Sequence, residues 1–108
     1  MICSSLKKAD LPQAKDIDES AFMSCDSLTE VYLPEATSIG EYAFYGCTNL
    51  QTITIPSSVE IIEDEAFLLC ESLYYVTIFS NKITFGKSVF WGCSQLIYVD
   101  YYSIRDKC

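Results

Sequence analysis

Apolar and polar positions alternate in short stretches along this chain, and the stretches return every 22 or 23 residues. In one such stretch, Val31 and Leu33 alternate with polar neighbours and follow Leu28. Alternation that includes β-branched residues predicts a short strand buried on one face. The leucine that opens each stretch recurs at Leu6, Leu28, Leu50, Leu73 and Leu96.

A second apolar group follows each predicted strand, and its first member lies five residues before the phenylalanine of the same repeat. In one repeat it consists of Ile39, Ala43 and Phe44, a spacing that suits one helical turn with its apolar side toward the strands. Proline ends three of the strands, because it has no N–H for a strand ladder: Pro12, Pro34 and Pro56. Each repeat is therefore expected to contain a strand, a turn, a short helical or irregular segment and a return.

Leucine, phenylalanine, cysteine and proline share this one period. A period of this length that carries leucines is a mark of the leucine-rich-repeat solenoid. The 108 residues are too few for two ordinary domains. We therefore predict a single solenoid over residues 1–108 with about four and a half repeats, at 3–24, 25–46, 47–69, 70–92 and, in part, 93–108.

The repeat also resembles a known family. Residues 28–50 contain Leu-x-x-Val-x-Leu-Pro and then Ser-Ile-Gly-x-x-Ala-Phe-x-Gly-Cys, which is similar to the BspA-like leucine-rich repeats of bacterial and protozoan surface proteins. The resemblance covers about residues 3–100, with departures at Phe79, Phe85 and Val89. It implies an α/β repeat fold, a short right-handed solenoid with a parallel β-ladder on one face and short helices or turns on the other. It also implies a cell-surface or secreted setting, although the first residues do not have the pattern of a signal peptide.

One cysteine in each repeat occupies the same position, and these residues should stack in a column. Cysteine packs as a small hydrophobe, so buried thiols are the favoured interpretation, with disulfides between adjacent turns as the alternative. No metal site is predicted, because no second set of ligands converges on the column. The predicted column contains Cys3, Cys25, Cys47, Cys70 and Cys93, while Cys108 is out of register and is either free or paired with a partner chain.

Charge and composition exclude several functions. Fifteen acidic and seven basic residues give a net charge of -8, which argues against nucleic-acid binding. No apolar stretch is long enough to insert into a membrane. Without histidine there is no His base or His metal ligand, and no motif couples a nucleophile to another base. We expect neither an enzyme nor a cofactor, and we interpret the acidic run at residues 63–65 as a solvated turn at a helix start.

The polar positions of the strands predict a binding surface. Their side chains should face outward in two columns, and three tyrosines among them favour a protein interface, although tyrosine also has a high β-propensity. The predicted surface consists of Lys8, Asp10, Glu30, Tyr32, Thr52, Thr54, Tyr75, Thr77, Tyr98 and Asp100. The leading hypothesis is a non-catalytic protein-binding module for adhesion or recognition, whose partner by resemblance is a host or cell-surface protein. A carbohydrate is a second candidate ligand.

The alternative function is structural. Terminal repeats of a solenoid need polar caps, and this sequence shows none. Uncapped ends expose strand edges that favour association. The chain is then a spacer or stacking segment of a larger surface protein, able to self-associate through its ends.

Overall fold

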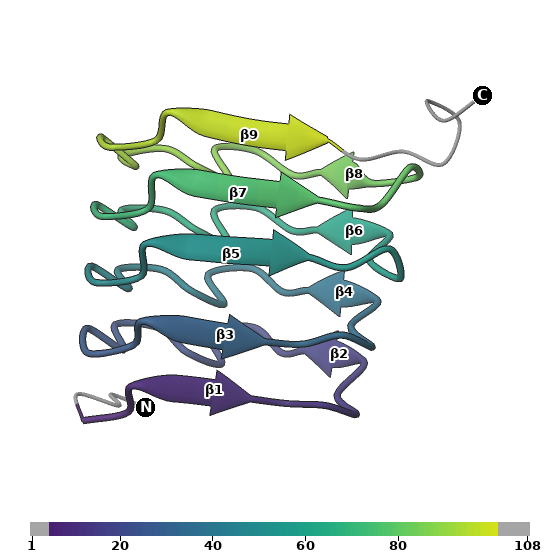
Figure 1. Ribbon diagram of the computed structural model, residues 1–108, viewed down its shortest axis with the longest axis horizontal. Helices are drawn as coiled ribbons and strands as arrows, with labels where there is room; N and C mark the ends of the chain where they lie inside the picture. Colours follow the sequence, from purple (N-terminus) through teal and green to yellow (C-terminus); the bar gives the residue numbers. More distant parts are fainter. Residues whose placement is uncertain (1–4, 102–108) are drawn as a thin grey trace.

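A computed structural model describes residues 5–101 of the chain as a parallel β-solenoid. Figure 1 shows one longer strand in each turn, stacked on the strand of the next turn. These strands, which we call the front ladder, are β1 (Lys8–Asp10), β3 (Glu30–Tyr32), β5 (Thr52–Ile55), β7 (Tyr75–Ile78) and β9 (Tyr98–Tyr101). The predicted parallel strand stack is thereby confirmed.

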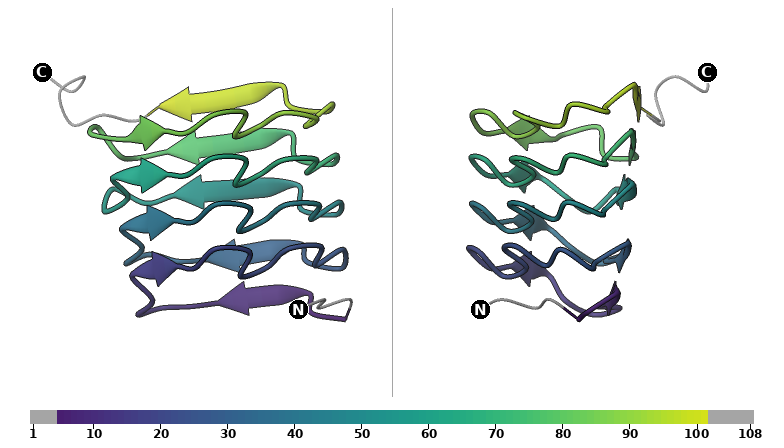
Figure 2. Two further views of the ribbon diagram at one scale, coloured as in Figure 1. Left: turned by 180° about the vertical axis from the view of Figure 1, so that it is seen from behind. Right: turned by 90° about the vertical axis from the view of Figure 1, so that its left-hand side faces the viewer.

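A second, shorter ladder lies behind the first and is seen from behind in Figure 2. This back ladder consists of β2 (Asp16–Ile17), β4 (Ser38–Ile39), β6 (Ile61–Ile62) and β8 (Thr84–Phe85). Its strands pair in the order β2-β4-β6-β8. Each contributes an apolar residue to the interior, so the isoleucines that the sequence assigned to helical turns are strand residues.

The predicted helical segments are wrong, because residues 5–101 contain strands and turns but no helix. The turns after the back ladder carry two left-handed residues four positions apart, such as Tyr42 (φ 60°) and Gly46 (φ 71°). A left-handed residue interrupts a right-handed helix. The backbone amides bond to the neighbouring turn instead, as where the Phe44 N–H donates to the Ala66 carbonyl at 2.8 Å.

The interior is built from columns of identical residues. Phenylalanine rings of successive turns stack nearly parallel, with centroids 5.4, 5.1 and 5.6 Å apart. Four cysteines, the ones at 25, 47, 70 and 93, are buried thiols. The Sγ of Cys70 donates to the Phe44 carbonyl at 3.1 Å, and that of Cys93 to the Phe67 carbonyl at 3.2 Å. The remaining two cysteines, Cys3 and Cys108, lie outside the described residues.

Neighbouring thiols in the column affect each other's pKa. A hydrogen bond with the Cys93 thiol and burial in the apolar interior raise the pKa of Cys70. The same hydrogen bond lowers the pKa of Cys93, so the two thiols shift in opposite directions, and burial adds to the preference of Cys70 for its protonated form. The thiols therefore fill the interior, and they also donate hydrogen bonds to backbone carbonyls of the preceding turn.

Candidate functional site

The outward side chains of the front ladder form a continuous surface of polar and aromatic groups. In the parallel register Lys8 pairs with Glu30 and Asp10 with Tyr32. The next three strands align the remaining members of the predicted surface, as Thr52, Tyr75 and Tyr98 in one column and Thr54, Thr77 and Asp100 in the other. Of the residues between the columns, Ala9, Ile53 and Val76 are buried, so these strands hold the surface on an apolar core.

Two tyrosines of this surface have different environments. The Tyr75 hydroxyl donates to Asp100 Oδ2 at 2.6 Å across the β7–β9 pair, which fixes the ring. Tyr32 has no such hydrogen bond in the described part of the chain, and 55% of it is exposed. The third tyrosine, Tyr98, shares the register of Tyr75, and only its backbone is described. Of these two tyrosines, Tyr32 is therefore the one more available to a partner.

The front ladder is interrupted between β3 and β5. Its hydrogen-bonded orders are β1-β3 and β5-β7-β9, whereas the back ladder pairs through all four of its strands. We call this interruption the seam. It falls where the repeat length changes, because Pro34 precedes Ile39 by five residues and Pro56 precedes Ile62 by six. The extra residue lies after β5, between β5 and β6, so the turns on the two sides of the seam differ in the length of the segment that joins front and back strands.

The seam opens a hollow of about 460 Å³ on the outward face. Val31 is partly exposed at its floor, although the equivalent Ala9, Ile53 and Val76 are buried. The hollow is lined by Lys8, Asp10, Glu30, Val31, Tyr32, Thr52, Ile53 and Thr54. Six of these belong to the predicted surface. The hollow itself was not predicted, although the change of interval from 22 to 23 residues is a signal for it in the sequence.

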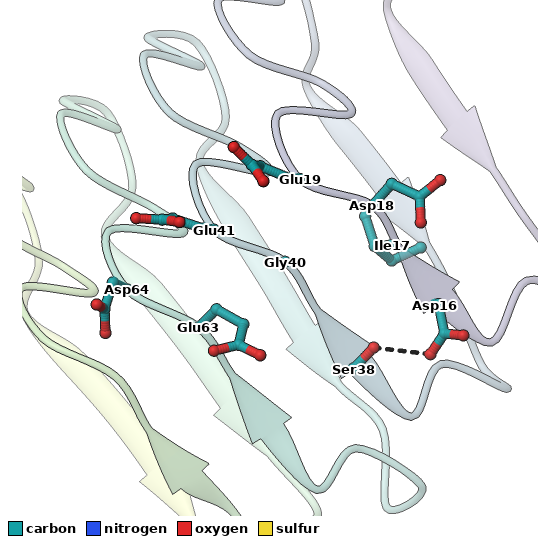
Figure 3. A pocket seen from close by; sticks show the side chains of 9 residues that line it. All are labelled: Asp16, Ile17, Asp18, Glu19, Ser38, Gly40, Glu41, Glu63 and Asp64. Atoms are coloured by element: carbon teal, nitrogen blue, oxygen red, sulfur yellow. Dashed lines mark hydrogen bonds between the residues drawn. The ribbon is translucent and has the colours of Figure 1, made fainter.

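A second hollow, of about 400 Å³, lies on the back of the molecule and is strongly acidic (Figure 3). Its wall includes Glu19, Glu41 and Asp64, one from each of three successive turns. Burial and then the carboxylates of Glu19, Asp64 and their neighbours raise the pKa of Glu41. The Ser38 hydroxyl donates to Asp16 Oδ1 at 2.8 Å at the edge of this hollow. Within residues 5–101 no group of three or more cysteines and carboxylates is arranged to hold a metal ion.

The acidic run at residues 63–65 belongs to the turn that leaves the back ladder. The expected helix start is wrong, because no helix follows in the described chain. The charges are held by local hydrogen bonds instead. Asp64 Oδ1 accepts from the Lys87 N–H at 2.8 Å, and Glu65 Oε1 accepts from the Tyr42 hydroxyl at 3.2 Å. The run therefore connects three neighbouring turns.

Other exposed apolar groups gather at the last described turn. Trp91 is 64% exposed and Ile97 is 68% exposed. Neither residue belongs to the surface predicted from the sequence. None of the described residues forms a helix long and apolar enough to cross a membrane.

Known proteins share both the repeat and the fold. Residues 1–106 match the profile of the BspA type leucine rich repeat region in six copies. A leucine-rich repeat protein from Bacteroides ovatus, solved as a crystal structure, superposes with a TM-score of 0.84 at 38% identity, over 90% of this chain and 25% of that one. A leucine rich cell surface protein from Faecalibacterium prausnitzii superposes with a TM-score of 0.66 at 22% identity, over 89% of this chain and 30% of that one.

A search of curated protein sequences found no significant match. The chain spans between a quarter and a third of the two solved proteins, which are therefore much longer. The profile match covers nearly the whole sequence, and the more similar of the two structures agrees with it in fold and repeat type. The family resemblance found in the sequence is thereby confirmed, and the chain belongs to the BspA-type leucine-rich repeat family.

Proposed function

We propose that this chain is a non-catalytic protein-binding segment of a surface protein, and that it binds through the outward face of the front ladder. The observation that carries the proposal is the aligned double column of exposed side chains over a buried core. A rigid backbone presents such a surface at low entropic cost, because the groups that meet the partner are already ordered. Tyr32 supplies a large amphipathic contact of the kind enriched at interface centres.

The chemistry of the chain supports binding over catalysis. Leucine-rich repeats of this family are generally non-enzymatic, and function in a solenoid depends on the displayed surface. The surface setting follows from the family in the same way. A carbohydrate is less favoured than a protein as the partner, because the surface is long and shallow and carries charges of both signs, Lys8 against Asp10, Glu30 and Asp100.

A display selection tests the proposal. A random-peptide library is selected on the purified chain, and the recovered peptides are tested against two arginine substitutions. Thr54→Arg places a large charge on the front ladder, and Thr84→Arg places the same charge on the back ladder, where the residue is also exposed. Peptides that lose binding to the first variant and keep it to the second support the front surface. Equal binding to both variants would refute it.

A structural role is the second candidate, and one observation favours it. Val99 occupies the inward column of β9 and is 42% exposed, whereas its register partner Val76 is fully buried. A further turn or a second copy stacked on β9 would cover it. Sedimentation velocity over a range of concentrations tests this, with Val99→Lys as the variant that should prevent association. If the chain is a monomer at all concentrations, self-association through this end is refuted.

A further inference from the structure

The seam leaves part of the β3 backbone outside any ladder. The Tyr32 carbonyl accepts from the Leu11 N–H at 2.8 Å and so faces β1. Alternate residues of a strand direct their peptide groups to opposite neighbours, so those of Val31 face β5. Because β5 is not a hydrogen-bonded neighbour of β3, these groups line the hollow and need water or a ligand.

Around these groups the hollow combines three kinds of surface. Its floor is apolar where Val31 is partly exposed. Its β1–β3 side carries the carboxylates of Asp10 and Glu30 together with the exposed ring of Tyr32. Its β5 side carries two threonine hydroxyls, from Thr52 and Thr54. A guest therefore needs an apolar stem, a flat donor-rich head and a positive charge.

We propose that the seam hollow binds an arginine side chain of a partner protein, an inference that rests on the proposed function and specifies its partner. The methylene stem of arginine covers the apolar floor. Its planar guanidinium stacks on the Tyr32 ring and donates in a forked geometry to a carboxylate such as Glu30. The remaining donors reach the hydroxyls and the peptide carbonyl that the seam leaves unpaired.

Charge decides against other guests. Two carboxylates and one ammonium, that of Lys8, line the hollow, and the whole chain carries a net charge of -8. An anionic guest would meet this negative field at close range, whereas a cation is drawn toward it. Lysine fits less well than arginine, because its compact ammonium keeps its water and does not stack as a plane.

The volume also suits such a guest. A hollow of about 460 Å³ is within the range of pockets that hold small ligands, so it accepts one long side chain and the backbone that carries it. The seam is confined to one position, because β5, β7 and β9 are paired throughout. The partner should therefore insert one arginine here and lay the rest of its contact along the paired strands.

The test uses the tripeptide acetyl-Gly-Arg-Gly-amide, titrated into the isotopically labelled chain and followed by amide NMR shifts. Saturable shifts are expected at residues 8–10, 30–32 and 52–54 and not along β7. The same peptide with citrulline in place of arginine keeps the shape and removes the charge, and it should bind about tenfold more weakly or not at all. Equal binding of both peptides would overturn the proposal, as would shifts confined to the acidic back hollow.

Two groups of variants give opposite expectations. Asp10→Asn combined with Glu30→Gln should weaken arginine-peptide binding about tenfold, since a charged hydrogen bond and its partner field are lost. Lys8→Gln should strengthen it about twofold, because a like charge leaves the hollow. The matched control, Thr84→Val, lies on the back ladder, outside the proposed binding surface, and should change nothing. Unchanged thermal midpoints show that each variant is folded.

The two proposals fail in different ways. If display-selected peptides lose binding to Thr54→Arg while the arginine tripeptide binds no better than its citrulline analogue, the front surface stands and the arginine guest is wrong. If Lys8→Gln weakens tripeptide binding and the carboxylate variant strengthens it, the charges of the hollow do not attract the guanidinium and the inference is overturned. If the display peptides are insensitive to Thr54→Arg, the proposed function itself fails.

Discussion

The phenylalanine column should contribute to stability in proportion to the number of ring neighbours each member has. Phe67 is fully buried between two rings, with centroids 5.1 and 5.6 Å away. Phe22 is partly exposed and has one described ring neighbour, at 5.4 Å. Leucine in place of either residue keeps most of the apolar area and removes the ring contacts.

The magnitude follows from the count of neighbours. An aromatic pair contributes about 0.5–1.5 kcal/mol beyond the area it buries. Phe67→Leu loses two pairs and should cost about 1–3 kcal/mol, whereas Phe22→Leu loses one and should cost about 0.5–1.5 kcal/mol. A change of shape adds less than about 1.5 kcal/mol to either variant. The expected difference of about 1 kcal/mol corresponds to a shift of about 4–8 °C in thermal midpoint for a domain of this size.

Urea unfolding followed by circular dichroism measures the free energy of unfolding for both variants and the wild type. The slope with urea should be the same in all three, because the surface exposed on unfolding hardly changes. Equal losses for the two variants would refute the reasoning, since ring stacking would then not be the source of the cost. A larger loss at Phe22 would contradict it more strongly.

Three further outcomes follow from the structure. Gly40→Ala should destabilise the chain by more than about 2 kcal/mol in urea unfolding, because its new Cβ would lie 2.7 Å from the Ile17 carbonyl oxygen; an unchanged midpoint would show that the turn can shift. Because the pKa of Cys70 is raised, the folded state keeps a proton that the unfolded chain releases at a pH of about 8.5. The contribution of Cys70 to stability should therefore be complete below that pH and fall as the pH rises above it. Cys70→Ala should lessen this alkaline loss in thermal melts measured over a series of pH values. The raised pKa of Glu41 means that its ionisation opposes folding, so the contribution of this group to stability should improve on acidification through the usual titration range of a glutamate. Glu41→Gln should raise the thermal midpoint at neutral pH, lose this gain in acid, and lose in high salt the part that is due to the neighbouring carboxylates. A gain that persists unchanged in high salt would contradict the electrostatic cause.

Much of the fold can be predicted from the sequence, because a solenoid repeats one solution. Residues such as Val31 and Leu33 alternate with polar ones, and this period of two specifies which face of the strand is buried. An interval of 22 or 23 residues between leucines then aligns the strands in parallel. The same arithmetic places the outward columns, and the register agrees with it within the β1–β3 pair and within the β5–β7–β9 group.

The back of each turn is where local pattern was misleading. Ile39, Ala43 and Phe44 have the spacing of a helical face, and the same spacing also fits a chain that bends twice and points those residues inward. The left-handed backbone of Tyr42 distinguishes the two arrangements, yet a tyrosine carries no sign of it in the sequence. Hydrogen bonds to the next turn hold that conformation, and they exist only once the turns are stacked.

The sequence by itself determined the repeat, the parallel stacking, the buried columns of phenylalanine and cysteine, and the residues that face outward on the front ladder. Only the tertiary structure decided that the back of the coil is a second ladder without helices. It also decided that the front ladder is unpaired between β3 and β5, beside the turn that carries one added residue after Pro56. The physical reason is the same in both cases. Side-chain periodicity specifies what each turn buries, whereas backbone pairing between turns depends on how well their paths match in space.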